Sequence, residues 1–324
     1  MVGDVTVVIP AYNAAPSIRD TLTSIFYQVL KPTEVIVVDD CSNDETISIA
    51  RSFGPAVRLI KVRSHLGRNS VLLNKGIKAA QTSFIQVFYP GDTMHSEMLH
   101  RLCNLAMLCP GIQAAFCDAS TFRPPDLNTQ PATQHEFKKF LQPLLPAGQN
   151  YYLLCQPLML EGLMHDFVPG EGVLFFSKEA WSWAGGYDES LNYAEDMDFA
   201  FKLARRYAFG YVDQKLIGRC RREPEYPAEI ERLESTLCGL KRYCNLSVSP
   251  AARRAILKRI SETEVELAWL CSDAGRLADA LAHWWKGWAV AGARPGMFVH
   301  SRKLCRHFVT LLCKRALLRS GKPA

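Results

Sequence analysis

Carboxylates follow two apolar runs in the first third of the sequence. Asp39 and Asp40 end the run EVIVVDD, and Asp92 follows the run FIQVFY and a Pro-Gly pair. An ionised carboxylate accepts hydrogen bonds, so the Asp39-Asp40 pair suits a nucleotide, whose base N–H and ribose hydroxyls are donors. Acids at such positions also cap the helix that follows, and the pair alone leaves both interpretations open.

The elements that position these acids follow from the pattern of apolar residues. Short runs rich in Val and Ile alternate with segments whose apolar residues recur at helical spacing. This βαβαβαβ order predicts an α/β fold with a mostly parallel, Rossmann-like sheet and helices on both of its faces. The predicted strands are 4–10, 34–40, 57–62 and the stretch from Phe84, and the predicted helices are 17–30, 42–53 and 70–81.

Three predicted strand ends carry notable residues, and ligands of open parallel sheets bind at the carboxyl ends of the strands. No GxGxxG motif follows the first strand, and no GxxxxGK[ST] motif occurs in the sequence. A dinucleotide-binding protein and a P-loop protein are therefore disfavoured. The three ends are Ala11-Tyr12-Asn13, Asp39-Asp40 and Pro90-Gly91-Asp92.

The rest of the sequence divides into regions of different composition. Residues 119–169 contain seven of the 18 prolines, which predicts a loop or lid. Residues 171–188 predict a strand and a helix that ends at Gly-Gly, and 194–208 predict a helix with an acidic first turn. One more strand precedes residue 222, and the pattern from Pro227 onward is helical. We therefore expect one domain at 1–222 and a helical region at 223–324.

The composition limits the class of protein. The chain has 324 residues, of which 48% are hydrophobic and 22% are charged, as in an ordinary globular protein. Its eleven cysteines form no CxxC pair or regular framework, which argues against a disulfide scaffold and for a reducing compartment. We expect no signal peptide in the opening MVGDVTVVIP and no membrane-spanning helix, because no uncharged apolar run reaches 18 residues.

Five ordered motifs between residues 4 and 215 together resemble the family 2 glycosyltransferases, which have the GT-A fold and transfer sugars from nucleotide-diphospho donors with inversion. The HLGRNSVLLNKGI motif contributes Gly67, Asn74 and Gly76. The motifs are VVIPAYN, SIFYQ, VIVVDDCSND, HLGRNSVLLNKGI and FFSKEAWSWAGGYDESLNYAEDMDF.

The resemblance implies a nucleotide site at the ends of the first two strands. The backbone of Ala11, the ring of Tyr12 and the carboxylate of Asp40 would hold the base and ribose, with Asp40 accepting from a uracil-type N–H. Arg68 precedes Asn74 by six residues, where some members have a basic residue that faces the base or the phosphates. A solvated loop arginine is the alternative for Arg68.

The resemblance also assigns the catalytic base to Asp196, with Glu195 beside it on the acceptor side. An acceptor hydroxyl is a poor nucleophile unless its proton is removed as the new bond forms, and a positioned carboxylate can contribute roughly 10²–10⁴-fold by doing so. The alternative is that these acids only favour the N-terminus of a helix, and Asp198 is a nearby competitor for the role.

The sequence departs from the family where the fourth strand ends. Members usually have an Asp-x-Asp run there, which contacts the ribose and holds a divalent cation on the diphosphate. Here the run is Tyr89-Pro90-Gly91-Asp92, so one acid remains. Asp92 with phosphate oxygens and water can still bind Mg²⁺ or Mn²⁺, although more weakly than two or three acids would. Gly91 would let the backbone approach the sugar-phosphate.

Basic residues near the last predicted strand can compensate for the missing acids. Arg219, Arg221 and Arg222 occupy a region where members often have His or Arg, and the planar guanidinium pairs well with phosphate. A basic surface loop is the alternative. The sequence lacks the Gln-x-x-Arg-Trp signature of processive synthases, so we expect the addition of single sugars.

The C-terminal region has two further features with open interpretations. Residues 297–324 carry seven positive charges and no acid, against a net charge of +6 for the whole chain. Such a basic amphipathic segment suits an anionic membrane surface or packs on its own domain. The Trp284–Trp288 stretch predicts helix-pair core rather than a platform for sugars.

The sequence therefore predicts an inverting glycosyltransferase that moves a sugar from a nucleotide-diphospho donor, in particular UDP, to a glycan or lipid-linked acceptor. The alternatives are a degenerate nucleotide-sugar-binding protein and a membrane-surface interaction protein. The Glu195-Asp196 pair favours the enzyme, since a binding protein needs no base. We expect a cytoplasmic location, with peripheral attachment to the inner face of the membrane through the tail, and no nucleic-acid partner.

Overall fold

A computed structural model describes residues 4–122, 142–143, 150–154, 174–220, 226–244, 246 and 249–291. Most of the Pro-rich segment 119–169 and all of the tail 297–324 lie outside these residues, and so do Arg221 and Arg222. The structure divides into two compact units, Met1–Glu223 and Pro224–Ala324.

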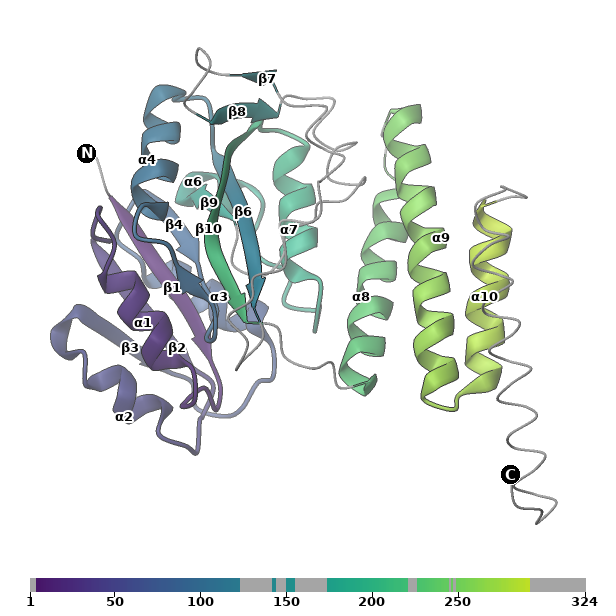
Figure 1. The fold of residues 1–324 in the computed structure, drawn as a ribbon, viewed down its shortest axis with the longest axis horizontal. Coiled ribbons are helices and arrows are strands. Elements are labelled where there is room, and N and C mark those ends of the chain that lie inside the picture. Colours follow the sequence, from purple (N-terminus) through teal and green to yellow (C-terminus); the bar gives the residue numbers. More distant parts are fainter. Residues whose placement is uncertain are drawn as a thin grey trace. The chain divides into compact units, whose positions relative to one another are not determined.

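The described strands of the first unit form one sheet (Figure 1). Its order is β3-β2-β1-β4-β9-β6-β10-β8-β7, and β5 pairs with β10 beside this path. The strands are β1 (Val5–Ala11), β2 (Glu34–Asp39), β3 (Val57–Lys61), β4 (Phe84–Val87), β5 (Thr93–Met94), β6 (Ala114–Phe122), β7 (Gln142–Pro143), β8 (Tyr151–Leu154), β9 (Phe175–Ser177) and β10 (Phe209–Cys220).

The first four strands pair in parallel, as their alternation with helices predicts. β1 lies between β2 and β4, and its last residue, Ala11, stands opposite Asp39. All seven residues of β1 are buried, which requires that both faces of the sheet be covered. The carboxyl ends of β1, β2 and β4 consequently meet at one edge, where the predicted nucleotide and phosphate residues lie.

The second half of the sheet is mixed. β9 pairs antiparallel with both β4 and β6, whereas β6 and β10 run parallel. The register of β10 against β6 shifts between Val212 and Lys215 and again before Ile217, as at β-bulges. The α/β fold class is confirmed, and the parallel pairing that the sequence predicts is concentrated in its N-terminal half.

The helices of the first unit cover this sheet. α3 packs against β1 and β2, and a Cβ on its Gly76 would lie only 2.4 Å from Val8 Cγ1 and 3.0 Å from Val38 Cγ2. Glycine therefore sets how closely α3 approaches the sheet. The helices are α1 (Ile18–Phe26), α2 (Thr46–Arg51), the 3₁₀ helix η1 (Gly54–Ala56), α3 (Asn69–Ala79), α4 (Met98–Leu108), α6 (Lys178–Trp183) and α7 (Glu195–Ala204).

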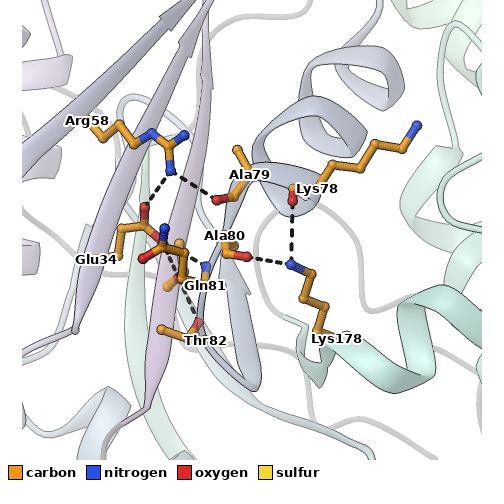
Figure 2. A network of polar contacts seen from close by, with 9 residues as sticks. Glu34, Arg58, Lys78, Ala79, Ala80, Gln81, Thr82 and Lys178 are labelled. Carbon is orange, nitrogen blue, oxygen red and sulfur yellow. Dashed lines mark hydrogen bonds and ion pairs between the residues drawn. The ribbon is translucent and has the colours of Figure 1, made fainter.

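A polar network fixes the end of α3 at the amino-terminal edge of the sheet, opposite the predicted site (Figure 2). Arg58 donates to Glu34 (3.1 Å) and to the carbonyl of Ala79 (3.0 Å), and Lys178 donates to the carbonyl of Ala80. The last carbonyls of a helix lack partners within the helix and attract cations. These two cations thus hold the C-terminus of α3 in place, which in turn fixes the position of its other end at the site.

The described part of the second unit consists of α8 (Tyr226–Cys244), α9 (Pro250–Asp273) and α10 (Leu277–Ala291). α9 contacts both of the other helices (Figure 1). The carboxylate of Glu264 on α9 is buried and joins all three, since it accepts from Lys241 Nζ (3.0 Å) and lies 2.7 Å from His283 Nδ1. No described helix combines the length and the low charge that a membrane crossing requires.

The expectation that the Trp284–Trp288 stretch forms core is wrong in part. The ring of Trp285 is 60% exposed and stacks on Trp288 with the ring centroids 6.1 Å apart, and Leu281 one turn earlier is also exposed. The helical spacing identified a helix with an apolar stripe. It did not identify which side of that helix α9 covers.

Candidate active site

The loops that follow β1 and β2 are tied together by hydrogen bonds. The amide of Ala14 donates to Thr46 Oγ1 (2.7 Å), and the amide of Ala15 donates to Asp44 Oδ2 (3.0 Å). Asp44 Oδ1 accepts from the amide of Thr46 (2.9 Å) at the start of α2. The acid that binds the first amide of α2 is therefore Asp44, one residue before the N-cap Glu45, and Asp40 acts elsewhere.

The carboxylate of Asp40 is buried and binds the loop that follows β3. Its Oδ1 accepts from the amide of Leu66 and its Oδ2 from the amide of Gly67, each at 2.8 Å. His65 Nδ1 lies 2.8 Å from the same Oδ2, and the amide of Asp40 donates to the carbonyl of Ala11 (2.8 Å). Asp40 thus joins the ends of three neighbouring strands at one point.

Tyr12 and His65 form an aromatic pair above this point. Their rings stack with centroids 4.1 Å apart and planes 27° apart. Both side chains are about half exposed, Tyr12 at 47% and His65 at 49%. Exposed stacked rings suit the faces of a nucleobase. The structure therefore brings together the predicted residues Ala11, Tyr12 and Asp40, and it adds His65 to them.

Asp39 has a different environment from its neighbour. It is fully buried, its Oδ2 accepts from the amide of Ser42 (3.2 Å), and its Oδ1 has no hydrogen-bond partner among the residues that the structure describes. A buried carboxylate oxygen without a donor is costly unless something else supplies one. Of the two adjacent acids, Asp39 is the one whose hydrogen-bonding capacity the chain leaves unfilled.

Arg68 and Asn74 connect α3 to the segment between α6 and α7. Arg68 is exposed and donates to the carbonyl of Glu189 (3.1 Å). Asn74 is buried, donates to the carbonyl of Tyr187 (2.9 Å) and accepts from the Tyr187 amide (3.0 Å) and from Trp181 Nε1 (3.2 Å). The Asn-x-Gly part of the sequence is thus structural: Asn74 holds the 181–189 segment, and Gly76 admits α3 to the sheet.

The turn after β4 is fastened to α1. Thr21 Oγ1 accepts from the amide of Gly91 (3.0 Å) and donates to the carbonyl of Asp92 (2.9 Å). Gly91 has a φ of 101°, which favours glycine at this position. This turn delivers the Asp92 side chain toward β10, where its Oδ1 accepts from the amide of Cys220 (3.3 Å) and its Oδ2 lies 3.9 Å from Arg219 Nε.

The side chains around Asp92 could hold a cation only if a bound nucleotide supplied further oxygen ligands. In the described part of the chain, no group of three or more His, Cys, Asp or Glu side chains lies close enough to hold a metal ion. Asp92 brings one carboxylate, and Mg²⁺ on a nucleotide is commonly held by one or two carboxylates plus phosphate oxygens and water. The chain's single acid therefore fits a cation that the diphosphate itself would mainly bind.

Three acids begin α7, and all are buried. Asp198 is fully buried and pairs with Lys202 at 2.8 Å, whereas Glu195 and Asp196 retain 6% and 9% exposure. Ala194 precedes them with a φ of 63°, a conformation that is uncommon for a residue other than glycine. Such backbone strain clusters at functional sites. The pairing with Lys202 gives the fully buried Asp198 a charge partner of its own.

The carboxylate of Asp196 lies beside two tyrosines. Tyr89, which follows β4, donates to Asp196 Oδ2 at 3.1 Å. Burial raises the pKa of Tyr187 well above its ordinary value of 10.0, and the charges of Asp196 and Glu195 and a hydrogen bond with Asp196 raise it further. Tyr187 therefore stays protonated as a donor. Through Tyr89, the turn that carries Asp92 meets the start of α7.

The profile of the family named Glycosyl transferase family 2 matches residues 6–142, which include β1 to β6 and the Asp92 turn. These residues make up less than half of the chain. This part of the chain is similar to the family 2 glycosyltransferases, in agreement with the resemblance of its motifs. Metal dependence, donor and acceptor do not follow from the match.

Curated relatives extend the likeness beyond the matched residues. An uncharacterized glycosyltransferase of Rickettsia prowazekii (strain Madrid E) is 26% identical over 224 residues, which are 67% of this chain and 63% of that protein. The succinoglycan biosynthesis protein ExoO of Rhizobium meliloti (strain 1021) is 28% identical over 259 residues, 80% of this chain and 69% of ExoO. The chain thus spans less than two thirds of the rickettsial relative.

Solved structures share the fold of this chain at low sequence identity. Residues 1–349 of Staphylococcus aureus TarS, in complex with UDP-GlcNAc, superpose with a TM-score of 0.64 and 16% identity over 98% of this chain and 92% of that one. The mannosyltransferase PcManGT of Pyrobaculum calidifontis, in complex with GDP-Man and Mn²⁺, superposes with a TM-score of 0.60 and 18% identity. This likeness covers 94% of this chain and 80% of that one. These likenesses establish the GT-A fold for this chain.

Sequence reasoning did not single out Tyr89, Tyr187 or His65 as residues of the candidate site. Tyr89 stands where the family usually has the first acid of its run, so the substitution itself was the available signal. His65 comes two residues before Gly67, and Tyr187 follows the Gly-Gly pair, but neither spacing indicates a partner. Their partners Asp196 and Asp40 are remote in sequence, which is why only the structure reveals these contacts.

Proposed function

We propose that the protein transfers a sugar, with inversion, from a UDP-linked donor to a hydroxyl of a glycan or lipid-linked acceptor, with Asp196 as the general base. The observation that carries the proposal is the 3.1 Å hydrogen bond from Tyr89 to Asp196. It joins the first turn of α7 to the turn of Gly91 and Asp92, so a base and a diphosphate corner lie at the same place.

The reaction needs one proton acceptor and one leaving-group site. Asp196 takes the proton of the acceptor hydroxyl as the hydroxyl oxygen attacks the anomeric carbon from the face opposite the diphosphate. The bond between that carbon and the diphosphate oxygen breaks, and its electron pair leaves with the nucleoside diphosphate. The attack from the opposite face inverts the anomeric configuration.

The environments of the three acids of α7 favour Asp196 as the base. Asp198 is fully buried and paired with Lys202. Asp196 keeps 9% exposure and has Tyr89 as a donor, so it combines access with orientation. Glu195 lies on the same turn and is assigned to the acceptor side.

The nucleotide would lie at the ends of β1 and β2. Tyr12 and His65 offer exposed ring faces to the base. Asp40 orients His65 and the amides of residues 66–67, and in this proposal it acts on the base both directly and through that loop. Arg68, held by the carbonyl of Glu189, would face the base or the phosphates.

The diphosphate would lie at Gly91, Asp92 and Arg219. Asp92 would hold a Mg²⁺ or Mn²⁺ ion on the phosphate oxygens, and such an ion supplies counter-charge to the leaving group. Arg219, 3.9 Å from Asp92, can place its guanidinium on the same phosphates. Arg221 and Arg222, outside the described residues, remain proposed helpers in this role.

A membrane surface would suit a lipid-linked acceptor. The exposed Trp285 and Leu281 of α10 form an apolar stripe, and the tail 297–324 that follows carries seven positive charges and no acid. Trp at the interface and Lys or Arg near anionic lipid are the side chains that peripheral binding uses. Co-sedimentation with vesicles of anionic and neutral lipid tests this role: equal binding with and without residues 297–324 would refute it.

The proposed function is tested with a panel of nucleotide sugars. Thermal shift identifies the donor, and initial rates of transfer and of slow donor hydrolysis are then measured with Mn²⁺ and Mg²⁺. Asp196→Asn should lower the transfer rate by about 10²–10⁴-fold while the Kd for UDP stays unchanged. Full activity of that variant would refute the base, and nucleotide binding without turnover of any donor would indicate a protein that has lost catalysis.

A further inference from the structure

Tyr89, at the first position of the depleted acid run, contacts the proposed base directly. It points its hydroxyl at Asp196 Oδ2, at 3.1 Å, instead of offering a carboxylate to a cation. The phenol of Tyr187, about a hundred residues away in the sequence, is buried near enough for the charge of Asp196 to raise its pKa. Asp196 therefore has Tyr89 as a hydrogen-bond donor and a second phenol nearby.

The surroundings of Asp196 make such donors necessary. Glu195, Asp196 and Asp198 are all nine-tenths buried or more within one helical turn. Burial and neighbouring like charges both favour the protonated form of a carboxylic acid, and a protonated Asp196 cannot accept a proton. Lys202 pairs with Asp198 and the helix N-terminus favours anions, and Tyr89 adds a hydrogen-bond donor at Asp196 Oδ2 itself.

Tyr187 is held rigidly enough to orient the carboxylate. Its carbonyl and its amide are both bound by the buried side chain of Asn74, at 2.9 and 3.0 Å. Its ring stacks on Phe199 of α7 with the centroids 4.4 Å apart. Gly186 before it has a φ of 76°, and a Cβ there would lie 2.8 Å from Asn74 Oδ1. A phenol fixed by these contacts has little freedom to turn away from Asp196.

Tyr89 is fixed from the other side of the site. It follows β4, and its carbonyl accepts from the amide of Asp92 (3.2 Å) within the turn that Thr21 fastens to α1. The same short turn therefore carries the donor to Asp196 and the acid of the diphosphate corner. Any shift of this turn would move both together.

We propose that Tyr89 is a positioning residue of the reaction, with the neighbouring Tyr187 phenol in support: the Tyr89 hydroxyl holds the Asp196 carboxylate ionised and aimed at the acceptor hydroxyl. The inference rests on the proposed function, because it assigns the base to Asp196. It explains why a tyrosine occupies a position that the resemblance would assign to an acid. The replacement gives up a ligand for the cation and gains a donor for the base.

The test compares Tyr89→Phe and Tyr187→Phe with the unchanged protein, because each removes one hydroxyl and keeps the ring. Tyr27→Phe, at a 74% exposed tyrosine on the end of α1, is the matched control. We expect each site variant to lower kcat about tenfold or more, as for a lost hydrogen bond to a charged group, with an unchanged Kd for UDP. The KM for the donor should change little.

The pH profile separates positioning from a merely structural role. A carboxylate that loses a donor takes up a proton more readily, so the acid limb of kcat/KM should move to higher pH in both site variants. The charged and titratable groups around Asp196 that remain in Tyr89→Phe are Glu195, Asp198, Lys202 and Tyr187. In the Asp196→Asn background, Tyr89→Phe should cause no further loss, because the two residues act as one unit.

The outcomes are distinguishable from a failure of the proposed function. If Asp196→Asn is inactive and both site variants keep the kcat and pH profile of Tyr27→Phe, the inference is wrong and the base assignment stands. An equal fold loss from Tyr89→Phe with and without Asp196→Asn also overturns it, because Tyr89 would then act elsewhere. Full activity of Asp196→Asn refutes the base and removes the inference with it.

Discussion

At the scale of single residues, the partners of each acid determine what it can do. Asp40 binds two amides and an imidazole and so organises a loop, whereas Asp198 is neutralised by Lys202. Asp196 accepts a hydrogen bond from the phenol of Tyr89, which leaves its negative charge in place. An aspartate thus anchors a loop at position 40, forms a buried ion pair at position 198 and is the candidate base at position 196. The sequence predicts where these acids stand but cannot predict their partners.

Asp92 should determine the affinity for the divalent cation. We expect Asp92→Asn to raise the Mn²⁺ concentration at half-maximal rate, because it removes the one carboxylate that the chain brings to the diphosphate corner. Arg219→Gln should instead raise the KM for the donor and leave the Mn²⁺ dependence unchanged. Rates measured across a Mn²⁺ titration, with circular dichroism to check folding, separate the two. An unchanged Mn²⁺ dependence in Asp92→Asn would show that this acid is not the ligand.

At the scale of elements, the sequence predicts the parallel half of the sheet well. The runs at β1 and β2 are almost wholly apolar and buried, which is what a doubly covered parallel sheet requires, whereas β3 at the edge has Arg58 and Lys61 exposed. β5, α4 and β6 were not anticipated, and β9 is too short to show a period. The pairing of β9 between β4 and β6 depends on contacts remote in sequence, so a local pattern carries no signal for it.

Gly76 should be required for the packing of α3. In Gly76→Ala the new Cβ would lie 2.4 Å from Val8 Cγ1 in a strand without free space, and overpacking of this kind costs about 1–3 kcal/mol. Alanine gains up to about 1 kcal/mol in a helix interior, so the net effect is a lower Tm of the first unit. Gly111→Ala, whose Cβ would meet nothing within 4 Å, is the control. Equal Tm values for the two variants would contradict this account.

Glu264 should make the helical unit sensitive to acid. Burial raises the pKa of Glu264, but hydrogen bonds from His283 and Lys241 outweigh that effect, so the pKa lies below its ordinary value of 4.5. A depressed carboxyl pKa contributes stability above the unfolded-state value and loses it as the pH falls through the folded-state value. Glu264→Gln should therefore lower the Tm at pH 7, and the difference from the unchanged protein should shrink below about pH 4.5.

The control for this prediction is Glu262→Gln on the same helix. Glu262 is 45% exposed, and its contacts with Lys258 and Arg259 are long surface pairs of 3.7 and 3.9 Å. Such pairs contribute little to stability, so the Tm should hardly change at any pH. A gap between Glu264→Gln and the unchanged protein that persists at pH 3 would mean that the loss comes from packing and not from the charge.

At the scale of the whole molecule, the chain divides into a sheet unit and a helical unit. The motifs predict the sheet unit in detail, because a nucleotide site requires particular residue types at particular strand ends. The helical unit shows no such motif, and its helical periodicity does not predict which side of α10 is exposed. The proposed nucleotide residues, from Ala11 to Arg219, all belong to the first unit. A ligand at that site should therefore raise the unfolding temperature of this unit.

UDP should raise the unfolding temperature of the first unit selectively. Binding at 100 times the Kd stabilises the unit that holds the site by about 2.7 kcal/mol, which for a unit of this size corresponds to roughly 5–11 °C. Differential scanning calorimetry assigns the transitions, because Gly76→Ala should lower one and Glu264→Gln the other. The UDP shift should then appear in the transition that Gly76→Ala lowers. A shift confined to the transition that Glu264→Gln lowers would place nucleotide binding in the helical unit and contradict the site assigned to Tyr12 and Asp40.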